Sequence, residues 1–171
     1  MYILPYAIGY GLVSLVGNSL GENNHHKAKK YIKIGLIKAS ILVLIVIIPM
    51  YLFRRDIAKF CFIEQEIIEI FIETFPICLI FIFIETINTC FQMSLVGMGK
   101  QIISSICGIC GYGTFCLLFG YIFVFKLKYK YKGFWMATSV GSIISMLTAM
   151  IIMACSDFEK IANKASKNIE K

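Results

Sequence analysis

Long stretches of the sequence lack charged residues altogether, and this absence excludes a soluble fold. The run Ala39–Phe53 contains no Asp, Glu, Lys or Arg, so a helix there would be apolar on every side. A helix of a soluble protein needs one polar face toward water. Hydrophobic residues make up 58% of the 171 residues, above the roughly 45–50% that is usual in soluble domains, and the mean hydropathy is +0.78. The sequence therefore predicts an all-α integral membrane protein.

The sequence also lacks the residue clusters that metal sites, cofactor sites and membrane-embedded transferases require. Cys107 and Cys110 have the CxxC spacing, but no second cysteine pair and no nearby histidine completes a metal site. The two histidines, His25 and His26, are neighbours in a hydrophilic segment, where solvation explains them. A transferase would need Asp, His or metal-ligand clusters near the membrane surface, and none is found. We expect neither an enzyme nor a bound cofactor.

Acidic residues are few: the sequence has 17 basic and 10 acidic residues, which gives a net charge of +7. A nucleic-acid-binding protein gathers its basic residues in a stripe or patch on a soluble face. Here the lysines lie in short segments between apolar runs, so nucleic acid is not an expected partner. Anionic headgroups of membrane lipids are the expected partner of these lysines.

Five apolar segments are each long enough to cross a bilayer, because about 20 helical residues span a hydrocarbon core of about 30 Å. Helices are expected because a lone strand would leave its backbone polar groups unpaired in lipid. We predict a membrane domain over residues 1–154 and a tail over residues 155–171. Four glutamates between 64 and 73 predict an interfacial turn before the third span. The predicted spans are 2–20, 33–53, 73–96, 102–125 and 134–154.

The distribution of basic residues predicts the orientation of the chain. Five spans place the two ends of the chain on opposite sides of the membrane. Nine lysines lie on the side of the C-terminal tail, and seven basic residues lie on the other side. The positive-inside rule therefore predicts a cytoplasmic tail, in the plasma membrane or in an organelle membrane.

Glu85 is the most informative polar residue, because it lies near the middle of the third predicted span. A charge at the centre of a membrane helix costs about 2.5–3.5 kcal/mol on insertion scales. Such a carboxyl group either faces a hydrated cavity or takes up a proton, and a proton-coupled transporter uses both behaviours. Asn88, Thr89 and Gln92 share its helix face at i+3, i+4 and i+7. These three are candidates for lining a cleft, and hydrogen bonding between helices is the alternative for them.

The first predicted span carries small and polar residues on one face. Gly17 and Gly21 have the small-xxx-small spacing that lets membrane helices approach closely, so we assign them to helix packing. Asn18 is a further candidate for lining the cleft, and structural hydrogen bonding is again the alternative. The fifth span repeats the small-residue spacing at Ala137, Gly141 and Ser145.

Several short motifs occur in an order that resembles the multidrug and toxic compound extrusion (MATE) family, eukaryotic type. The N-terminal ones are Pro5, Val16–Gly21 and Ala28–Lys30. Glu85 followed by Gly97–Gln101 resembles the acidic position and the Gly-x-Gly-x-Gln signature of that family. We assign Gly97 and Gly99 of this signature to helix packing. Further elements of the family are echoed at Gly111, Tyr112, Gly120 and Gly133–Trp135.

This resemblance implies both a fold and a function. MATE members have twelve helices in two six-helix lobes around a central cleft, and they export organic cations and other drugs in exchange for protons or sodium. The five spans would be helices eight to twelve, most of the C-terminal lobe. Glu85 would fall on the acidic position used for cation coupling or substrate recognition. The implied partners are a small organic cation, a proton or sodium ion, and an N-terminal lobe.

The sequence departs from the family pattern in three ways. Leu15 and Val96 stand where members carry arginine, and Leu118 stands where they carry proline. The N-terminal lobe and the seventh helix are missing, so we interpret the chain as a fragment of a transporter.

The alternatives are a non-transporting truncated product, a half-size subunit, and a flippase for lipid-linked or other solutes. A flippase would need basic residues in its cleft, and Lys38 is the only lysine that qualifies.

Overall fold

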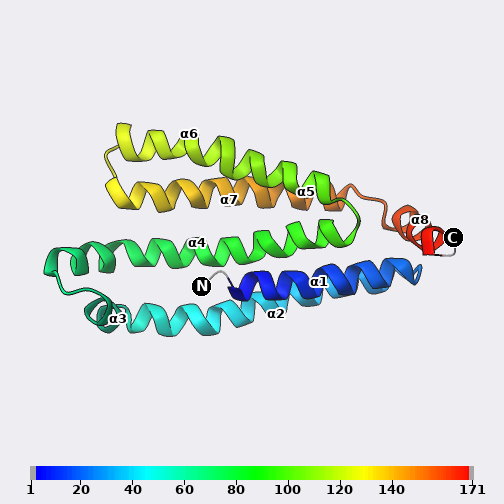
Figure 1. Cartoon of the computed structure of the whole chain (residues 1–171), viewed down its shortest axis with the longest axis horizontal. Coiled ribbons are helices and arrows are strands. Elements are labelled where there is room, and N and C mark those ends of the chain that lie inside the picture. The colour runs from blue at the N-terminus through cyan, green and yellow to red at the C-terminus, as the bar shows by residue number, and fades with distance from the viewer. Residues whose placement is uncertain (1–2, 170–171) are drawn as a thin grey trace.

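The structure is a computed structural model that describes residues 3–169, and every regular element within that range is helical (Figure 1). The all-α prediction is therefore confirmed. The helices are α1 (Ile3–Gly21), α2 (His25–Leu52), α3 (Arg54–Cys61), α4 (Gln65–Gly97), α5 (Gln101–Gly108), the π-helix η1 (Ile109–Phe115), α6 (Cys116–Gly120), the π-helix η2 (Tyr121–Lys126), α7 (Lys130–Ala154) and α8 (Phe158–Ile169).

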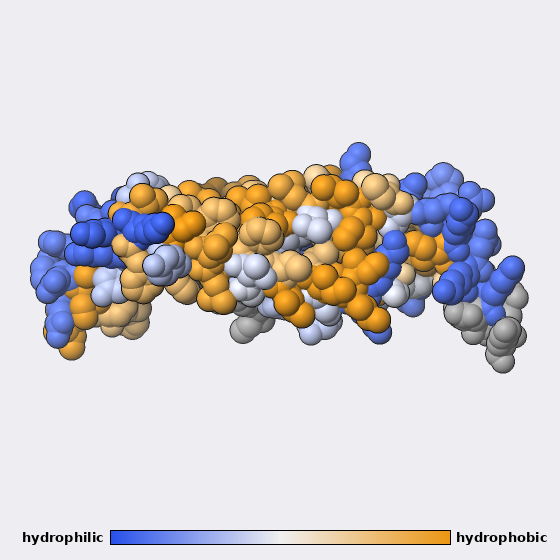
Figure 2. Space-filling view, turned by 90° about the horizontal axis from the view of Figure 1, so that it is seen from above, coloured by the Kyte–Doolittle hydropathy of each residue, from blue (hydrophilic) through white to orange (hydrophobic). Residues whose placement is uncertain are grey.

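The long helices run side by side along the longest axis of the molecule, with α4 between the α1–α2 pair and α7 (Figure 1). The visible face is hydrophobic along its middle and hydrophilic at both ends (Figure 2). Large apolar side chains are exposed on these helices; Ile45, for example, is 61% exposed. A surface of this kind suits contact with lipid and not with water. The chain is an integral membrane protein.

Four helices within residues 3–169 are long and apolar enough to cross a membrane, namely His25–Leu52, Gln65–Gly97, Gln101–Lys126 and Lys130–Ala154. They correspond to the second to fifth predicted spans. The first predicted span begins at Tyr2, which lies outside the described residues, and helix α1 covers the remainder. The count of five spans remains a prediction.

Two of the helices begin well before the predicted span boundaries. Helix α2 begins at His25 and not at Lys33, and α4 begins at Gln65 and not at Glu73. The predicted interfacial turn before the third span is therefore part of a continuous helix. The extension of both helices has a physical cause: Lys and Glu are good helix formers, so the charged residues before each apolar run do not end the helix. At about 1.5 Å per residue, the 33 residues of α4 extend for about 50 Å.

Two short amphipathic helices, α3 and α8, lie at the ends of the bundle (Figure 1). Within the predicted tail, Asp157 Oδ1 accepts a hydrogen bond from Lys160 N at 3.2 Å, which begins helix α8. Phe158 and Ala162, one turn apart, are buried in a cluster with residues of α1, α2, α4 and α7. The tail is thus packed against the bundle over this helix.

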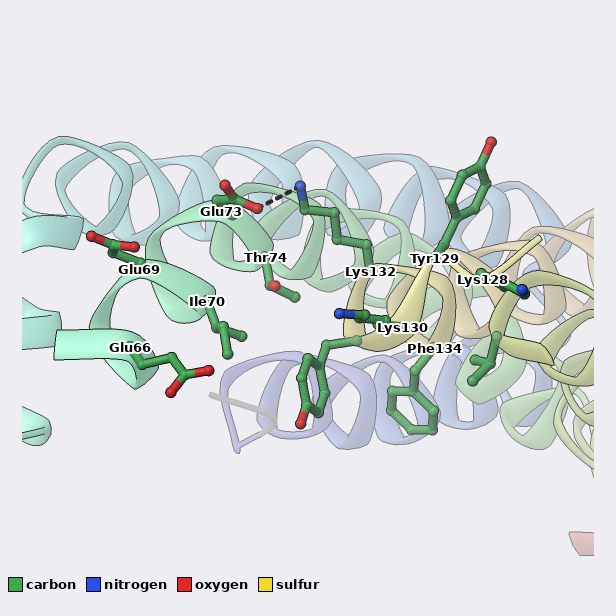
Figure 3. A pocket seen from close by; sticks show the side chains of 12 residues that line it. Glu66, Glu69, Ile70, Glu73, Thr74, Lys128, Tyr129, Lys130, Lys132 and Phe134 are labelled. Carbon is green, nitrogen blue, oxygen red and sulfur yellow. Dashed lines mark ion pairs between the residues drawn. The ribbon is translucent and has the colours of Figure 1, made fainter. Parts of the chain in front are cut away.

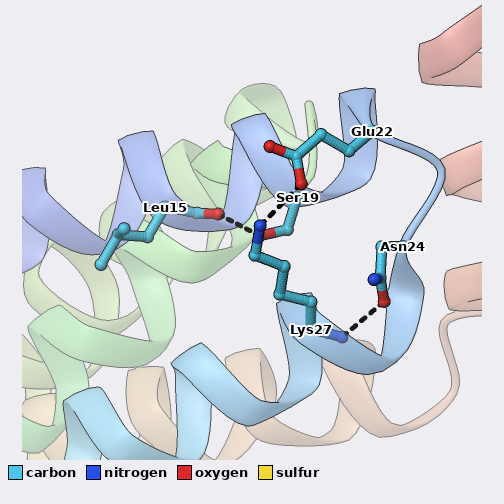
Figure 4. Close-up of polar contacts among 5 residues, drawn as sticks. All are labelled: Leu15, Ser19, Glu22, Asn24 and Lys27. Atoms are coloured by element: carbon cyan, nitrogen blue, oxygen red, sulfur yellow. Dashed lines mark hydrogen bonds and ion pairs between the residues drawn. The ribbon is translucent and has the colours of Figure 1, made fainter.

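A short polar connection joins α1 to α2 (Figure 4). Asn24 Oδ1 accepts from Lys27 N at 3.0 Å and caps α2, while the Lys27 ammonium pairs with Glu22 at 2.7 Å. Ser19 Oγ donates to the Leu15 carbonyl at 2.7 Å within α1. The Leu15 side chain is itself 45% exposed. The connection brings α2 back antiparallel to α1, so that both pack on α4.

Glycines set the closest helix contacts. A Cβ on Gly97 of α4 would lie 2.9 Å from the Val13 carbonyl oxygen, and one on Gly17 of α1 would lie 3.5 Å from the Gly97 oxygen. Helices α1 and α4 therefore meet backbone to backbone at this point, as small residues permit. Gly21 is the last residue of α1. Gly99 does not have the packing role assigned to it, because a Cβ there would meet nothing within 4 Å. Its φ of +74° instead favours glycine in the turn after α4.

Candidate functional site

Glu85 lies in the middle of α4 and is only 7% exposed. Its carboxylate accepts hydrogen bonds from three elements. Ser142 Oγ on α7 donates to Glu85 Oε2 at 2.6 Å, and the Tyr112 hydroxyl on η1 donates to the same oxygen. From its own helix, Asn88 Nδ2 donates at 3.3 Å and Thr89 Oγ1 donates to the other oxygen at 3.4 Å. We call Glu85, Asn88, Thr89, Tyr112 and Ser142 the Glu85 cluster.

The cluster is a connected polar network inside apolar helices. Tyr112 OH lies 3.2 Å from Ser142 Oγ, and Asn88 Nδ2 lies 3.2 Å from Tyr112 OH. Asn88 is 2% exposed and Ser142 is fully buried. Within residues 3–169, no lysine or arginine forms an ion pair with Glu85. The hydrogen-bond partners of the Glu85 carboxyl group in the cluster are all neutral hydroxyl and amide groups.

Asn88 adds a second acceptor to the cluster. Its amide nitrogen points at Glu85 and Tyr112, but its buried Oδ1 has no hydrogen-bond partner among the described residues. An unpaired buried carbonyl oxygen is costly, so a site that keeps one usually offers it to a ligand or water. Oxygen atoms from a carboxylate and an amide are ligands suited to a hard cation. No group of three or more His, Cys, Asp or Glu side chains in the described part of the chain could hold a metal ion.

Two π-helical segments interrupt the α-helix of the fourth predicted span, and Tyr112, which contacts Glu85, lies in the first of them. Tyr112 lies in η1, one of two π-helical segments that interrupt Gln101–Lys126. Such segments are rare and occur frequently at functional sites. The neighbouring Gly111 packs against Gly141 of α7: a Cβ on Gly111 would lie 2.7 Å from the Gly141 oxygen. This contact holds η1 against α7 beside Tyr112 and Ser142, whose hydroxyl groups reach Glu85 from these two helices.

The predicted site residues divide into two groups. Asn88 and Thr89 bond to Glu85, as their spacing suggests. Gln92 instead joins three helices: its Nε2 donates to Ser145 Oγ at 2.8 Å, and Ser104 Oγ donates to its Oε1 at 2.5 Å. The contacts of Gln92 are therefore those of the alternative role, which is hydrogen bonding between helices. Asn18 is exposed on α1, and no hydrogen bond within residues 3–169 joins its side chain to the cluster.

Sequence reasoning did not find two members of the cluster. In the sequence, Tyr112 stands out only as part of the Gly-Tyr motif, and nothing singles out Ser142. A signal was present for both, because each is a hydroxyl-bearing residue beside a packing glycine within an apolar span. What the sequence could not supply is the register of α4 against η1 and α7, which decides which side chains meet.

The fold and the Glu85 cluster define a polytopic helical membrane protein that keeps a carboxylate inside its helix bundle. The MatE family model matches residues 1–122. The chain belongs to this family, as the order of its motifs predicts.

Curated relatives and solved structures agree with this family. The chain is 23% identical to Protein DETOXIFICATION 7 of Arabidopsis thaliana, over 98% of this chain and 34% of the relative. It is also 23% identical to Multidrug and toxin extrusion protein 2 of Oryctolagus cuniculus, over 98% of this chain and 28% of the relative. The crystal structure of the eukaryotic MATE transporter AtDTX14 superposes with a TM-score of 0.86 at 19% identity, covering 96% of this chain and 37% of that one.

A second solved structure, an inward-facing multidrug resistance MATE family transporter, superposes with a TM-score of 0.83 at 21% identity over 90% of this chain. These likenesses establish the MATE transporter fold for the described bundle. The chain spans about a third of the length of the relatives that it matches.

Proposed function

We propose that this chain forms most of the C-terminal lobe of a secondary antiporter, which exports organic cations or other xenobiotics in exchange for protons or sodium. The buried Glu85 carboxylate, held by neutral donors from three elements, is the observation that carries this proposal. The five helical segments would be helices eight to twelve of a twelve-helix transporter. The C-terminus would face the cytoplasm, and an N-terminal lobe would close the substrate cleft.

Glu85 is proposed to alternate between a protonated and a charged form. A cationic substrate would favour the charged carboxylate, and a proton arriving from the other side would neutralise it and release the substrate. Each ligand would then favour one of two membrane-facing states, which is a shift between two populations. Asn88 Oδ1 lies in the same cluster and has no hydrogen-bond partner within residues 3–169, which supports this cluster as the place where sodium would bind if sodium is the coupling ion.

The alternative of a flippase for anionic lipid-linked solutes is less well supported. Such a function needs basic groups facing the cleft, and the cluster contains a carboxylate with no basic partner among the described residues. Lys38, the one lysine considered for that role, is exposed on α2.

Replacing Glu85 by Gln tests the proposal. The test needs a polypeptide that supplies the N-terminal lobe, from an upstream reading frame or from a chimera with Protein DETOXIFICATION 14 of Arabidopsis thaliana. Glutamine keeps the shape of the side chain but cannot exchange a proton. We expect E85Q to abolish ethidium efflux driven by a proton gradient, measured as loss of cell fluorescence.

Glu66→Gln is the matched control, because Glu66 lies on the same helix but is exposed. This variant should retain efflux. The 171-residue chain by itself should not transport, since one lobe cannot enclose a cleft. Undiminished efflux by E85Q would contradict the proposed role of Glu85.

A further inference from the structure

A groove of about 370 Å³ lies between the first turns of α2, the end of α7 and the start of α8. Two lysines, Lys29 and Lys33, line it from α2. They are four residues apart, so both side chains lie on one face of the helix. Both residues are exposed. The groove therefore has a cationic mouth at the hydrophilic end of the molecule.

Within residues 3–169, no ion pair neutralises the positive charge of this mouth. Among the described residues that line the groove, none is acidic, and no ion pair within residues 3–169 involves Lys29 or Lys33. The Lys29 ammonium lies 5.0 Å from the centre of the Phe158 ring, which fixes it beside α8. A third ammonium is close, because Lys100 Nζ donates to Ser156 of the groove wall at 2.5 Å.

The deeper wall of the groove is apolar. Ile32 and Leu36 of α2 face Met150 and Met153 of α7 across it. Leu36 lies one turn further into the membrane span than Ile32, and Met150 one turn further in than Met153. Met150 is 40% exposed, so this wall is open to the surroundings. The groove leads from charge at the membrane edge to apolar side chains at hydrocarbon depth.

The opposite end of the molecule offers a useful contrast (Figure 3). There, glutamates of α4 and lysines before and within α7 line one larger pocket. Lys132 pairs with Glu73 at 2.8 Å, and Glu66 and Glu69 add further negative charge. Opposite charges offset one another in that pocket, so it has no net attraction for an anion. The groove at the α8 end, in contrast, combines two lysines that form no ion pair within residues 3–169 with an apolar wall.

We propose that this groove binds an anionic phospholipid. Lys29 and Lys33 would hold its phosphate, and one acyl chain would lie along Ile32, Leu36 and the two methionines. Lysines at a membrane surface attract anionic headgroups, and the apolar wall adds the burial of hydrocarbon. The bound lipid would link α8 to α2 and α7 at this edge of the bundle. This inference goes beyond the transport function and does not depend on it.

Native mass spectrometry of the chain in detergent tests the lipid site, with phosphatidylglycerol as the probe and phosphatidylcholine as the zwitterionic comparison. We expect the protein to retain phosphatidylglycerol preferentially. The double variant K29Q/K33Q should bind it about 30-fold more weakly, as the loss of two surface lysines implies. The double variant K128Q/K130Q, which removes two lysines from the opposite end, should bind it as the unchanged protein does.

A second variant tests the apolar wall separately. Met150→Trp keeps both lysines but fills the deeper part of the groove, so it should also weaken phosphatidylglycerol binding. Equal retention of phosphatidylglycerol by K29Q/K33Q and by the unchanged protein would overturn the proposal. Inorganic phosphate that competes as well as the lipid does would also overturn it, because the site would then recognise free phosphate without need of an acyl chain.

Discussion

Replacing Gly141 by alanine is expected to destabilise the protein by about 1–3 kcal/mol, the usual cost of overpacking. A Cβ on Gly141 would lie 2.6 Å from the Gly111 carbonyl oxygen and 3.1 Å from Cys116 Cβ. The nearest of these atoms belongs to the backbone, so it cannot move aside as a flexible side chain would. The helix containing η1 must therefore shift away from α7. Thermal unfolding in detergent, followed by size-exclusion chromatography, measures the loss.

Gly108→Ala provides the matched control, because a Cβ on Gly108 would meet nothing within 4 Å. Alanine is the better helix former by about 1 kcal/mol, so this variant should be as stable as the unchanged protein or more so. The two substitutions add the same methyl group and are expected to act with opposite sign. Equal stability of G141A and G108A would contradict the close backbone contact between η1 and α7.

Replacing Ser142 by alanine is expected to reduce substrate efflux at least tenfold in the two-lobed transporter. The Ser142 hydroxyl donates to the Glu85 carboxylate at 2.6 Å from the opposing helix α7. A hydrogen bond to a charged group contributes about 1.5–3 kcal/mol, so its loss weakens, by a factor of about ten or more in the equilibrium constant, the charged carboxylate that the proposed cation binding requires. Initial rates of ethidium efflux from loaded cells measure the effect.

Ser139→Ala is the control for this experiment. Ser139 lies on the same helix, and its hydroxyl donates to the Trp135 carbonyl oxygen at 2.7 Å within α7. Its loss removes a hydroxyl of the same kind without touching the Glu85 cluster, so efflux should stay within about twofold of normal. Equal efflux by S142A and S139A would show that the hydroxyl facing Glu85 has no part in transport.

The sequence predicted the positions of the long helices well, because each depends on a run of apolar residues that the bilayer requires. Helix α2 begins eight residues before the predicted span that starts at Lys33, and α4 begins eight residues before the one that starts at Glu73, because Lys and Glu beside an apolar run do not end a helix. The short helices α3 and α8 were not predicted. Their apolar faces cover only one or two turns, as with Phe158 and Ala162, and their packing depends on tertiary contacts.

Only part of the candidate site was predicted, because its contacts between helices also depend on tertiary packing. Spacing along one helix is enough to place Asn88 and Thr89 beside Glu85. Gln92, a further turn away, faces α5 and α7 instead, because the helices around α4 decide which polar groups meet at each level. Tyr112 and Ser142 depend on the contact between Gly111 and Gly141, and the sequence shows small residues there but not which of them meet.

The proton balance of substrate binding tests the central claim most directly. The two-lobed transporter is placed in weakly buffered detergent solution near neutral pH, ethidium is added, and the released protons are measured with a pH indicator. If Glu85 exchanges its proton for a cationic substrate, the unchanged protein releases up to about one proton per bound molecule, and E85Q releases none. Ethidium binding without proton release, or the same release from E85Q, would contradict the account.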